Sequence, residues 1–455
     1  MPLFPFPVGG CSQASIQRFA ISTPSARVPG DPAQSNGVKS HSSDHSCCHH
    51  INSLSQLLDA VPPKQTSDAL YYNFLSGIHP LTLLLHVQTF RSQYDRFWEW
   101  YSTWNREDIP SGILAEIPSF LPLLFAVLFA GSFGLQDASL SPEDVTTLYN
   151  SHSCSLSLVA FPQSPTIYSL CAFLIVQNLL VREEEALSAC SFVGIALRAA
   201  QAMGLHRDGS HFGLDPIQTE IRRRVWWHII HTDVMTCLSA GLPPLMVVDY
   251  LYDTKMINEL KDDYIGTPEE ALQAQSPQTY FENSGQKKST ELGATGSLDG
   301  SRICIYHVVA IGRYQITSLM RKLLRRQFSV EPITLEEIAS LKRAVDQQSS
   351  ETAAIIRRIA MMQLYSPDGE EIRAHRSSSF RGVSVRPFQS WSQRLLRLMT
   401  HKAYSMLYQP LLRGKYGKVS SRARREYVST TFSGSPRINT FTVRYDIAMA
   451  ILKTS

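Results

Sequence analysis

Residues 184–241 constrain the fold more than any other part of the chain, because they predict two long helices joined by a short glycine-containing turn. In residues 184–203, apolar side chains recur every three or four positions on two adjacent stripes, which leaves only a narrow polar strip. A helix with this pattern is buried on most sides. Gly204 follows it and supplies the left-handed residue that ends many helices.

The second helix has clear start and stop signals. Asp215 is a good N-cap and Pro216 suits the first helical position. The helix is expected to end near Ala240, because Gly241 and Pro243 follow. These local signals place the helix over about 25 residues, as the capping rules predict.

Three consecutive arginines, Arg222 to Arg224, stand directly before Trp226 and Trp227 in this helix. Successive helical residues turn by about 100°, so the three arginines fan over about 300° and cannot all face one DNA backbone. We therefore favour a structural role, in which the guanidinium groups stack on the tryptophans and pair with carboxylates such as Glu220. A basic patch that contacts phosphate or a partner is the alternative.

The segment between the two helices, His206-Arg207-Asp208, is interpreted in the same way. A capping or interhelix pairing role is favoured over chemistry.

Composition and periodicity set the fold class. Of the 455 residues 44% are hydrophobic and 18% charged, which is ordinary for a soluble globular protein. Strand-like alternation is almost absent. We predict a mainly α fold, a multi-helix, bundle-like regulatory domain with disordered N-terminal and insertion segments. The predicted parts are a disordered segment 1–66, a helical domain 67–265, a flexible polar insertion 266–300, the C-terminal helical part 301–413 and a weakly ordered basic tail 414–455.

Charge, cysteines and apolar runs narrow the functional classes. The net charge of +4 is too small to argue for nucleic acid by itself. None of the eight cysteines forms a Cys-x-x-Cys pair, which favours reduced thiols in an intracellular protein. The apolar runs 121–134 and 170–181 are too short to span a bilayer and suit core helices.

Candidate enzyme and metal motifs are weak. Asp262-Asp263 could be a metal-binding pair as in helical terpene-forming enzymes, but a solvated acidic loop is the favoured interpretation. The histidine- and cysteine-rich residues 41–50 match no zinc-site spacing. Nucleophile-elbow, dinucleotide-binding and Walker-type motifs are missing from the sequence. We predict no catalytic residues, no metal site and no cofactor in this chain, so it is not expected to be an enzyme.

One set of residues carries a family resemblance. The set consists of Arg198, Gly204, Leu205, His206, Arg207, Asp208, Arg222, Arg223, Arg224, Trp226, Trp227, Asp233, Gly241 and Pro243. With similar segments at 70–90 and 401–413, the chain resembles the middle homology region of fungal zinc-cluster transcription factors over residues 68–413. We predict that these residues are structural, while the DNA-binding residues remain unassigned.

The resemblance implies a nuclear regulator of genes transcribed by RNA polymerase II, controlling a metabolic or biosynthetic gene set. It implies contact with DNA directly or through a partner protein, homo- or heterodimers, and contact with the transcription machinery, but no membrane. Two alternatives stay open: a partner of a zinc-cluster factor that does not itself bind DNA, and a helical enzyme of small-molecule metabolism.

The chain departs from the family at its N-terminal side. The family reads DNA through six cysteines that share two zinc ions, whereas Cys11, Cys47 and Cys48 are the only cysteines before residue 154. Zinc is therefore expected only if such a cluster exists outside this sequence. Either the regulator works without its own DNA-reading module, or the sequence lacks its true N-terminus.

Overall fold

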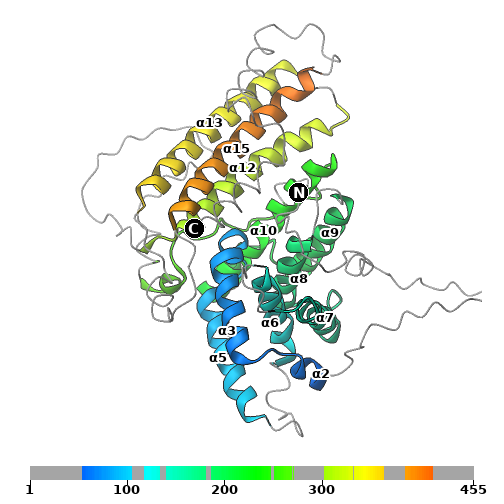
Figure 1. Cartoon of the computed structure of the whole chain (residues 1–455). Helices are drawn as coiled ribbons and strands as arrows, with labels where there is room; N and C mark the ends of the chain where they lie inside the picture. The colour runs from blue at the N-terminus through cyan, green and yellow to red at the C-terminus, as the bar shows by residue number, and fades with distance from the viewer. Residues whose placement is uncertain are drawn as a thin grey trace, which may run out of the picture.

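The computed structural model describes residues 54–104, 117–133, 140–180, 186–246, 251–268, 270, 302–331, 333–362 and 385–412. These residues are mainly helical (Figure 1), which confirms the predicted fold class. Among them, the one β-type pairing is an isolated antiparallel bridge between Leu260 and Ile303. The elements are α2 (Leu54–Asp59), α3 (Lys64–Asn73), the π-helical turn η1 (Phe74–Ile78), α4 (His79–Thr82), α5 (Val87–Thr103), α6 (Ile117–Ser132), α7 (Pro142–Leu158), α8 (Ile167–Leu180), α9 (Ala186–Ala202), the 3-10 turn η3 (Gly209–Phe212), α10 (Pro216–Ala240), the 3-10 turn η5 (Asp262–Tyr264), α12 (Ile305–Gln327), α13 (Leu335–Met361) and α15 (Val385–Leu412).

The first boundary predicted from sequence is wrong. Residues 54–66 were assigned to the disordered N-terminal segment, but they contain α2 and the start of α3. Leu57 and Leu58 are buried, and α2 packs against α7. Two buried leucines in one helical turn are enough to order this short segment once α7 covers them. The predictions for residues 1–53, 271–301 and 413–455 lie outside the described residues.

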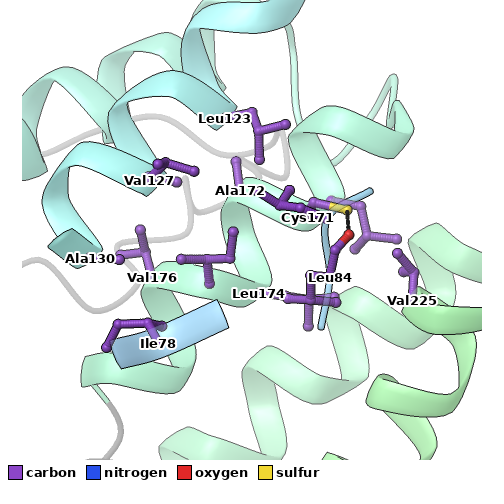
Figure 2. Close-up of a cluster of buried hydrophobic side chains, with 14 of the residues drawn as sticks. Ile78, Leu84, Leu123, Val127, Ala130, Cys171, Ala172, Leu174, Val176 and Val225 are labelled. Carbon is purple, nitrogen blue, oxygen red and sulfur yellow. Dashed lines mark hydrogen bonds between the residues drawn. The ribbon is translucent and has the colours of Figure 1, made fainter. Parts of the chain in front are cut away.

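A large apolar core fills the N-terminal two thirds of the fold. The nearly all-apolar α6 packs against α3, α7 and α8. Figure 2 shows side chains of α6 and α8 in this core, with Leu123 and Val127 of α6 near Ala172 and Val176 of α8. The two apolar runs therefore form core helices, as predicted. Within the described residues, no helix is long and apolar enough to cross a membrane.

Gly131 marks the point where α6 crosses the backbone of α3. A Cβ atom at this position would lie 2.0 Å from the carbonyl oxygen of Leu70. We expect Gly131→Ala to lower the free energy of unfolding by about 1–3 kcal/mol, because the two helices must separate to admit the methyl group.

The matched control for this clash is Gly77→Ala, since nothing lies within 4 Å of a Cβ at Gly77. Urea denaturation followed by circular dichroism compares the two variants. Equal midpoints for them would show that the approach of α6 to α3 is not as tight as described.

The C-terminal part forms a second packed unit. Helices α12, α13 and α15 lie side by side in a group (Figure 1) around their own apolar cluster. Tyr404 of α15 donates a 2.8 Å hydrogen bond to Asp346 of α13. Helix α10 joins this unit to the first, because it packs against both α9 and α12. The arginine-rich helix therefore occupies the centre of the molecule.

Candidate functional site

The helix pair that carries the family-like residues forms as the local signals predict. Helix α9 ends at Ala202, and Gly204 follows in the left-handed region with φ of +74°. Helix α10 begins at Pro216, and the Asp215 side chain accepts hydrogen bonds from two backbone N–H groups of its first turn. Gly241, with φ of +68°, ends α10.

Arg222 contacts the end of the preceding helix. Its Nη1 atom donates a 3.1 Å hydrogen bond to the carbonyl oxygen of Met203, directly after the last residue of α9. The last carbonyl groups of a helix have no partner within the helix and carry partial negative charge. Arg222 therefore caps α9 and fixes it against α10.

Arg223 makes a bidentate pair with Asp208 in the turn between the helices. Its Nε and Nη2 atoms each lie 2.7 Å from a carboxylate oxygen of Asp208. The Asp208 side chain is fully buried and also accepts bonds from the backbone of Ser210 and Lys255. Burial would raise the pKa of Asp208, but the bonds from Arg223 outweigh it and hold the pKa well below its ordinary value. This pair ties the turn, α10 and the segment around Lys255 together.

Arg224 lies at the centre of the fold and is 0% exposed. Its guanidinium group donates to Glu220 at 3.0 Å, to Asp262 at 2.7 Å and to the carbonyl oxygen of Leu85 at 3.0 Å. The three acceptors come from α10, from η5 and from the segment between α4 and α5. One side chain thus joins three parts of the chain that are far apart in sequence.

The segment before α5 explains why a buried arginine is needed here. Residues 82–86 are buried but mostly lack helical hydrogen bonding, and a buried backbone group without a partner is costly. Side chains from other elements supply partners within this segment and at the residues that flank it, Leu81 and Val87. These bonds are Arg313 to Leu81 O, Cys171 to Leu84 O, Arg224 to Leu85 O, and Val87 N to Asp262.

Asp262 corrects a prediction. The pair Asp262-Asp263 was interpreted as a solvated acidic loop, but the Asp262 side chain is only 12% exposed and pairs with Arg224. Its second oxygen accepts a 2.7 Å bond from the N–H of Val87. Burial would raise the pKa of Asp262, yet the positive charge of Arg224 holds it well below its ordinary value. The buried guanidinium, which sequence alone cannot place next to residue 262, is the physical reason.

The two tryptophans pack against aromatic rings rather than against the arginine triplet. Trp226 is fully buried 5.6 Å from the ring of Tyr252, and Trp227 stacks on Tyr314 at 6.2 Å. The predicted stacking of Arg222 to Arg224 on these rings is absent from the described residues. In this region it is Arg321 that lies over an aromatic ring, 5.1 Å from the centre of Tyr252.

Asp233 holds the turn that follows α10. Its two oxygens accept bonds from the N–H groups of Leu245 and Met246, at 3.1 and 3.2 Å. Pro243 lies exposed between Gly241 and these residues. The aspartate therefore sets the direction in which the chain leaves the helix.

The remaining family-like residues surround the turn after α9. Leu205 is fully buried, and its N–H bonds to the carbonyl of Ala200. His206 lies 6.3 Å from Trp226, and Arg207 pairs with Asp253 at 2.9 Å. Arg198 is exposed and bonds to Gln201 on its own helix.

Sequence reasoning missed a second polar group in the core. Arg313 donates 2.8 Å bonds to Leu81 O and to Nε2 of His231, whose Nδ1 lies 2.8 Å from the Thr317 hydroxyl. Because the guanidinium can only donate, His231 is neutral with its proton on Nδ1. The signal was available, since Arg313, Thr317 and Arg321 recur every four residues on an otherwise apolar stripe of α12.

The titratable groups of this region do not form a metal site. Among the described residues, no group of three or more histidine, cysteine, aspartate or glutamate side chains could hold a metal ion. The residues 41–50 singled out above lie outside the described part of the chain. Arg222, Arg223 and Arg224 with their acceptors form what we call the arginine network. Its geometry is that of a structural junction made by bidentate and buried ion pairs.

Comparison with known proteins assigns this part of the chain to a family. Residues 72–331 match the model of the fungal specific transcription factor domain, which is more than half of the chain. The chain belongs to this family. The fungal specific transcription factor domain thus begins at the end of α3, extends past α12 and contains every residue of the arginine network.

Named relatives agree with the family. Over 229 residues the chain is 36% identical to transcription factor yanR of Aspergillus niger, which covers 48% of this chain and 28% of the relative. It is 36% identical over 206 residues to transcription factor macR of Penicillium terrestre, covering 43% and 24%. It is 28% identical over 181 residues to pyriculol/pyriculariol biosynthesis cluster transcription factor 1 of Pyricularia oryzae, covering 38% and 22%.

The matched part of the chain therefore spans about a quarter of the length of these curated relatives. No solved structure matches the chain.

Proposed function

We propose that this chain acts in the nucleus as the regulatory part of a transcription factor for a biosynthetic gene set transcribed by RNA polymerase II. The match of residues 72–331 to the fungal specific transcription factor domain carries the proposal. The names of three relatives support it, since each is a transcription factor and one is assigned to a biosynthesis cluster.

The arginine network shapes how such a regulator would reach DNA. Arg223 and Arg224 are committed to carboxylates inside the fold, so they leave no free guanidinium for a phosphate backbone. We propose that DNA contact is made by residues outside the network or through a partner protein, and that the helical domain transmits regulation.

The test is to delete the gene in its own host and to replace it with a fluorescently tagged copy. The proposal expects nuclear fluorescence, and it expects the transcripts of a defined gene set to fall in the deletion strain and recover with the tagged copy. Cytosolic fluorescence together with an unchanged transcript profile would contradict it.

Chromatin association of the tagged copy separates the two routes to DNA. Association of a protein that purifies without a zinc-cluster partner supports direct contact. Association that disappears when a co-purifying zinc-cluster protein is deleted supports the partner route.

A further inference from the structure

We propose that Cys190 and Cys237 form a reversible disulfide that links α9 to α10 when the protein meets a peroxide. This inference does not depend on the proposed function. It assigns an oxidative modification site to the helix pair at the centre of the domain.

The two thiols lie on facing helices that pack against each other. Cys190 is in the first half of α9 and Cys237 is in the last turn of α10. Burial raises the pKa of the Cys237 thiol, and the neighbouring side chains of Asp233 and Cys190 raise it further, which places the two thiols within range of each other. Both are free thiols in the structure.

A second set of contacts places the same parts of the two helices together. Gly194 lies one helical turn after Cys190, and a Cβ at Gly194 would be 3.8 Å from the side chain of Leu245. The N–H of Leu245 donates to Oδ1 of Asp233 at 3.1 Å, and the Cys237 sulfur lies 3.4 Å from the same oxygen. The face of α9 that carries Cys190 and Gly194 therefore meets the region around Cys237.

Small side chains allow the close approach that a disulfide requires. A disulfide needs Cα atoms about 4.4–6.8 Å apart, which is closer than helices with large side chains permit. On α9, Ala189 and Gly194 flank Cys190 along the helix. The small side chains beside Cys190 therefore leave room for the close approach of α10 that a disulfide requires.

The difference in exposure between the two thiols determines which of them reacts first with the peroxide. Cys190 is half-buried and within reach of a small oxidant, whereas Cys237 is 2% exposed. The Cys190 thiolate attacks one oxygen of hydrogen peroxide, the O–O bond breaks, and the released hydroxide takes up a proton to become water. Cys190 is then a sulfenic acid.

In the second step the sulfur of Cys237 attacks the sulfur of Cys190. The S–S bond forms, the S–O bond breaks, and the hydroxyl leaves as water with the proton of the Cys237 thiol. The Asp233 carboxylate already accepts a hydrogen bond from the Cys237 thiol, so it is placed to receive this proton and pass it to the leaving hydroxyl. In total, two thiols lose two electrons and two protons, and one peroxide becomes two waters.

Other cysteines provide an internal contrast. The Cys171 thiol donates to the carbonyl oxygen of Leu84 in the apolar core, and burial raises the pKa of the Cys171 thiol to about 12. Burial likewise raises the pKa of Cys304 to about 12. A neutral buried thiol reacts slowly with peroxide, so Cys171 and Cys304 should stay reduced, and Cys237, which is buried too, should react only with a sulfenic acid already formed on its neighbour Cys190.

The test uses the full 455-residue chain, reduced and then exposed to hydrogen peroxide. Free thiols are alkylated, the protein is digested without reduction, and the peptides are identified by mass spectrometry. The proposal expects a linked pair of peptides containing Cys190 and Cys237, lighter by two hydrogens than the separate peptides and separated again by dithiothreitol.

Two variants sharpen the result. Cys190→Ser should abolish the link and leave Cys237 reduced and alkylated after unfolding, while the control Cys154→Ser should keep the link. Since the wild-type peptide map needs no substitution, a poorly folded variant cannot hide the answer. Peroxide treatment that leaves both cysteines reduced, or that takes Cys190 to a sulfinic acid without a link, overturns the proposal.

Discussion

Acidification should unfold this domain between about pH 5.5 and 4.5, before most of its carboxylates are protonated. The cause is a set of fully buried histidines whose pKa values are lowered by burial. These are His79 and His152, each with a pKa of about 4, and His228 and His307, each with a pKa of about 3.

The sign of the effect follows from proton binding. In the folded protein these rings stay neutral, whereas in the unfolded chain they take up protons below about pH 6.5. The unfolded state therefore binds more protons, so stability is full above pH 6.5 and falls as the pH drops towards 4. Each ring costs about 1.4 kcal/mol per pH unit in that window, and the four together about 5. Domain stabilities are about 5–15 kcal/mol, and a stability of about 5–10 kcal/mol is lost within one to two pH units.

The measurement is the free energy of unfolding by urea at a series of pH values, followed by circular dichroism. His152→Gln should make the dependence shallower by about one proton, because it removes one of the four rings. His401→Gln, at an exposed position of α15, is the matched control and should leave the slope unchanged. Stability that stays flat down to pH 4 in all three proteins would contradict this explanation.

Replacing Arg224 with methionine should lower the free energy of unfolding by about 3–5 kcal/mol, since removing one partner of a buried ion pair leaves an uncompensated charge. The substitution leaves Asp262 without its cation and the carbonyl of Leu85 without its donor. Glu220 is affected less, because burial raises its pKa and it also accepts from the N–H of Asn258.

The matched control is Arg198→Met, which removes an arginine of the same family motif from an exposed surface. A surface change of this kind alters stability by no more than about 0.5 kcal/mol. Urea denaturation compares the two variants with the wild type. If both arginines proved equally dispensable, the network around Arg224 would not hold the fold together.

The parts of the site that follow from sequence are those set by neighbouring residues. The ends of α9 and α10 depend on Gly204, Asp215 and Gly241, whose backbone and capping preferences act within one helical turn. The fan of the arginine triplet follows from helix geometry alone. These features could therefore be predicted without knowing what surrounds the helix.

The parts that escaped prediction depend on contacts between distant segments. Asp262 looks like a solvated acid until Arg224, 38 positions earlier, is placed beside it. Leu57 and Leu58 look like part of a disordered segment until α7 covers them. The end of α4 and the buried segment after it need side chains from α8, α10 and α12 to satisfy their backbone. Tertiary packing supplies this information, and local patterns do not contain it.

A double-mutant cycle between Arg224 and Asp262 tests most directly whether the arginine motif of this family holds the domain together. The free energy of unfolding is measured for the wild type, Arg224→Met, Asp262→Asn and the double variant. We expect the double variant to lose about 2 kcal/mol less than the two single losses combined, as for groups in one buried network. Losses that add within about 0.5 kcal/mol would show that the two residues act independently and that the arginine motif does not hold the domain together through this pair.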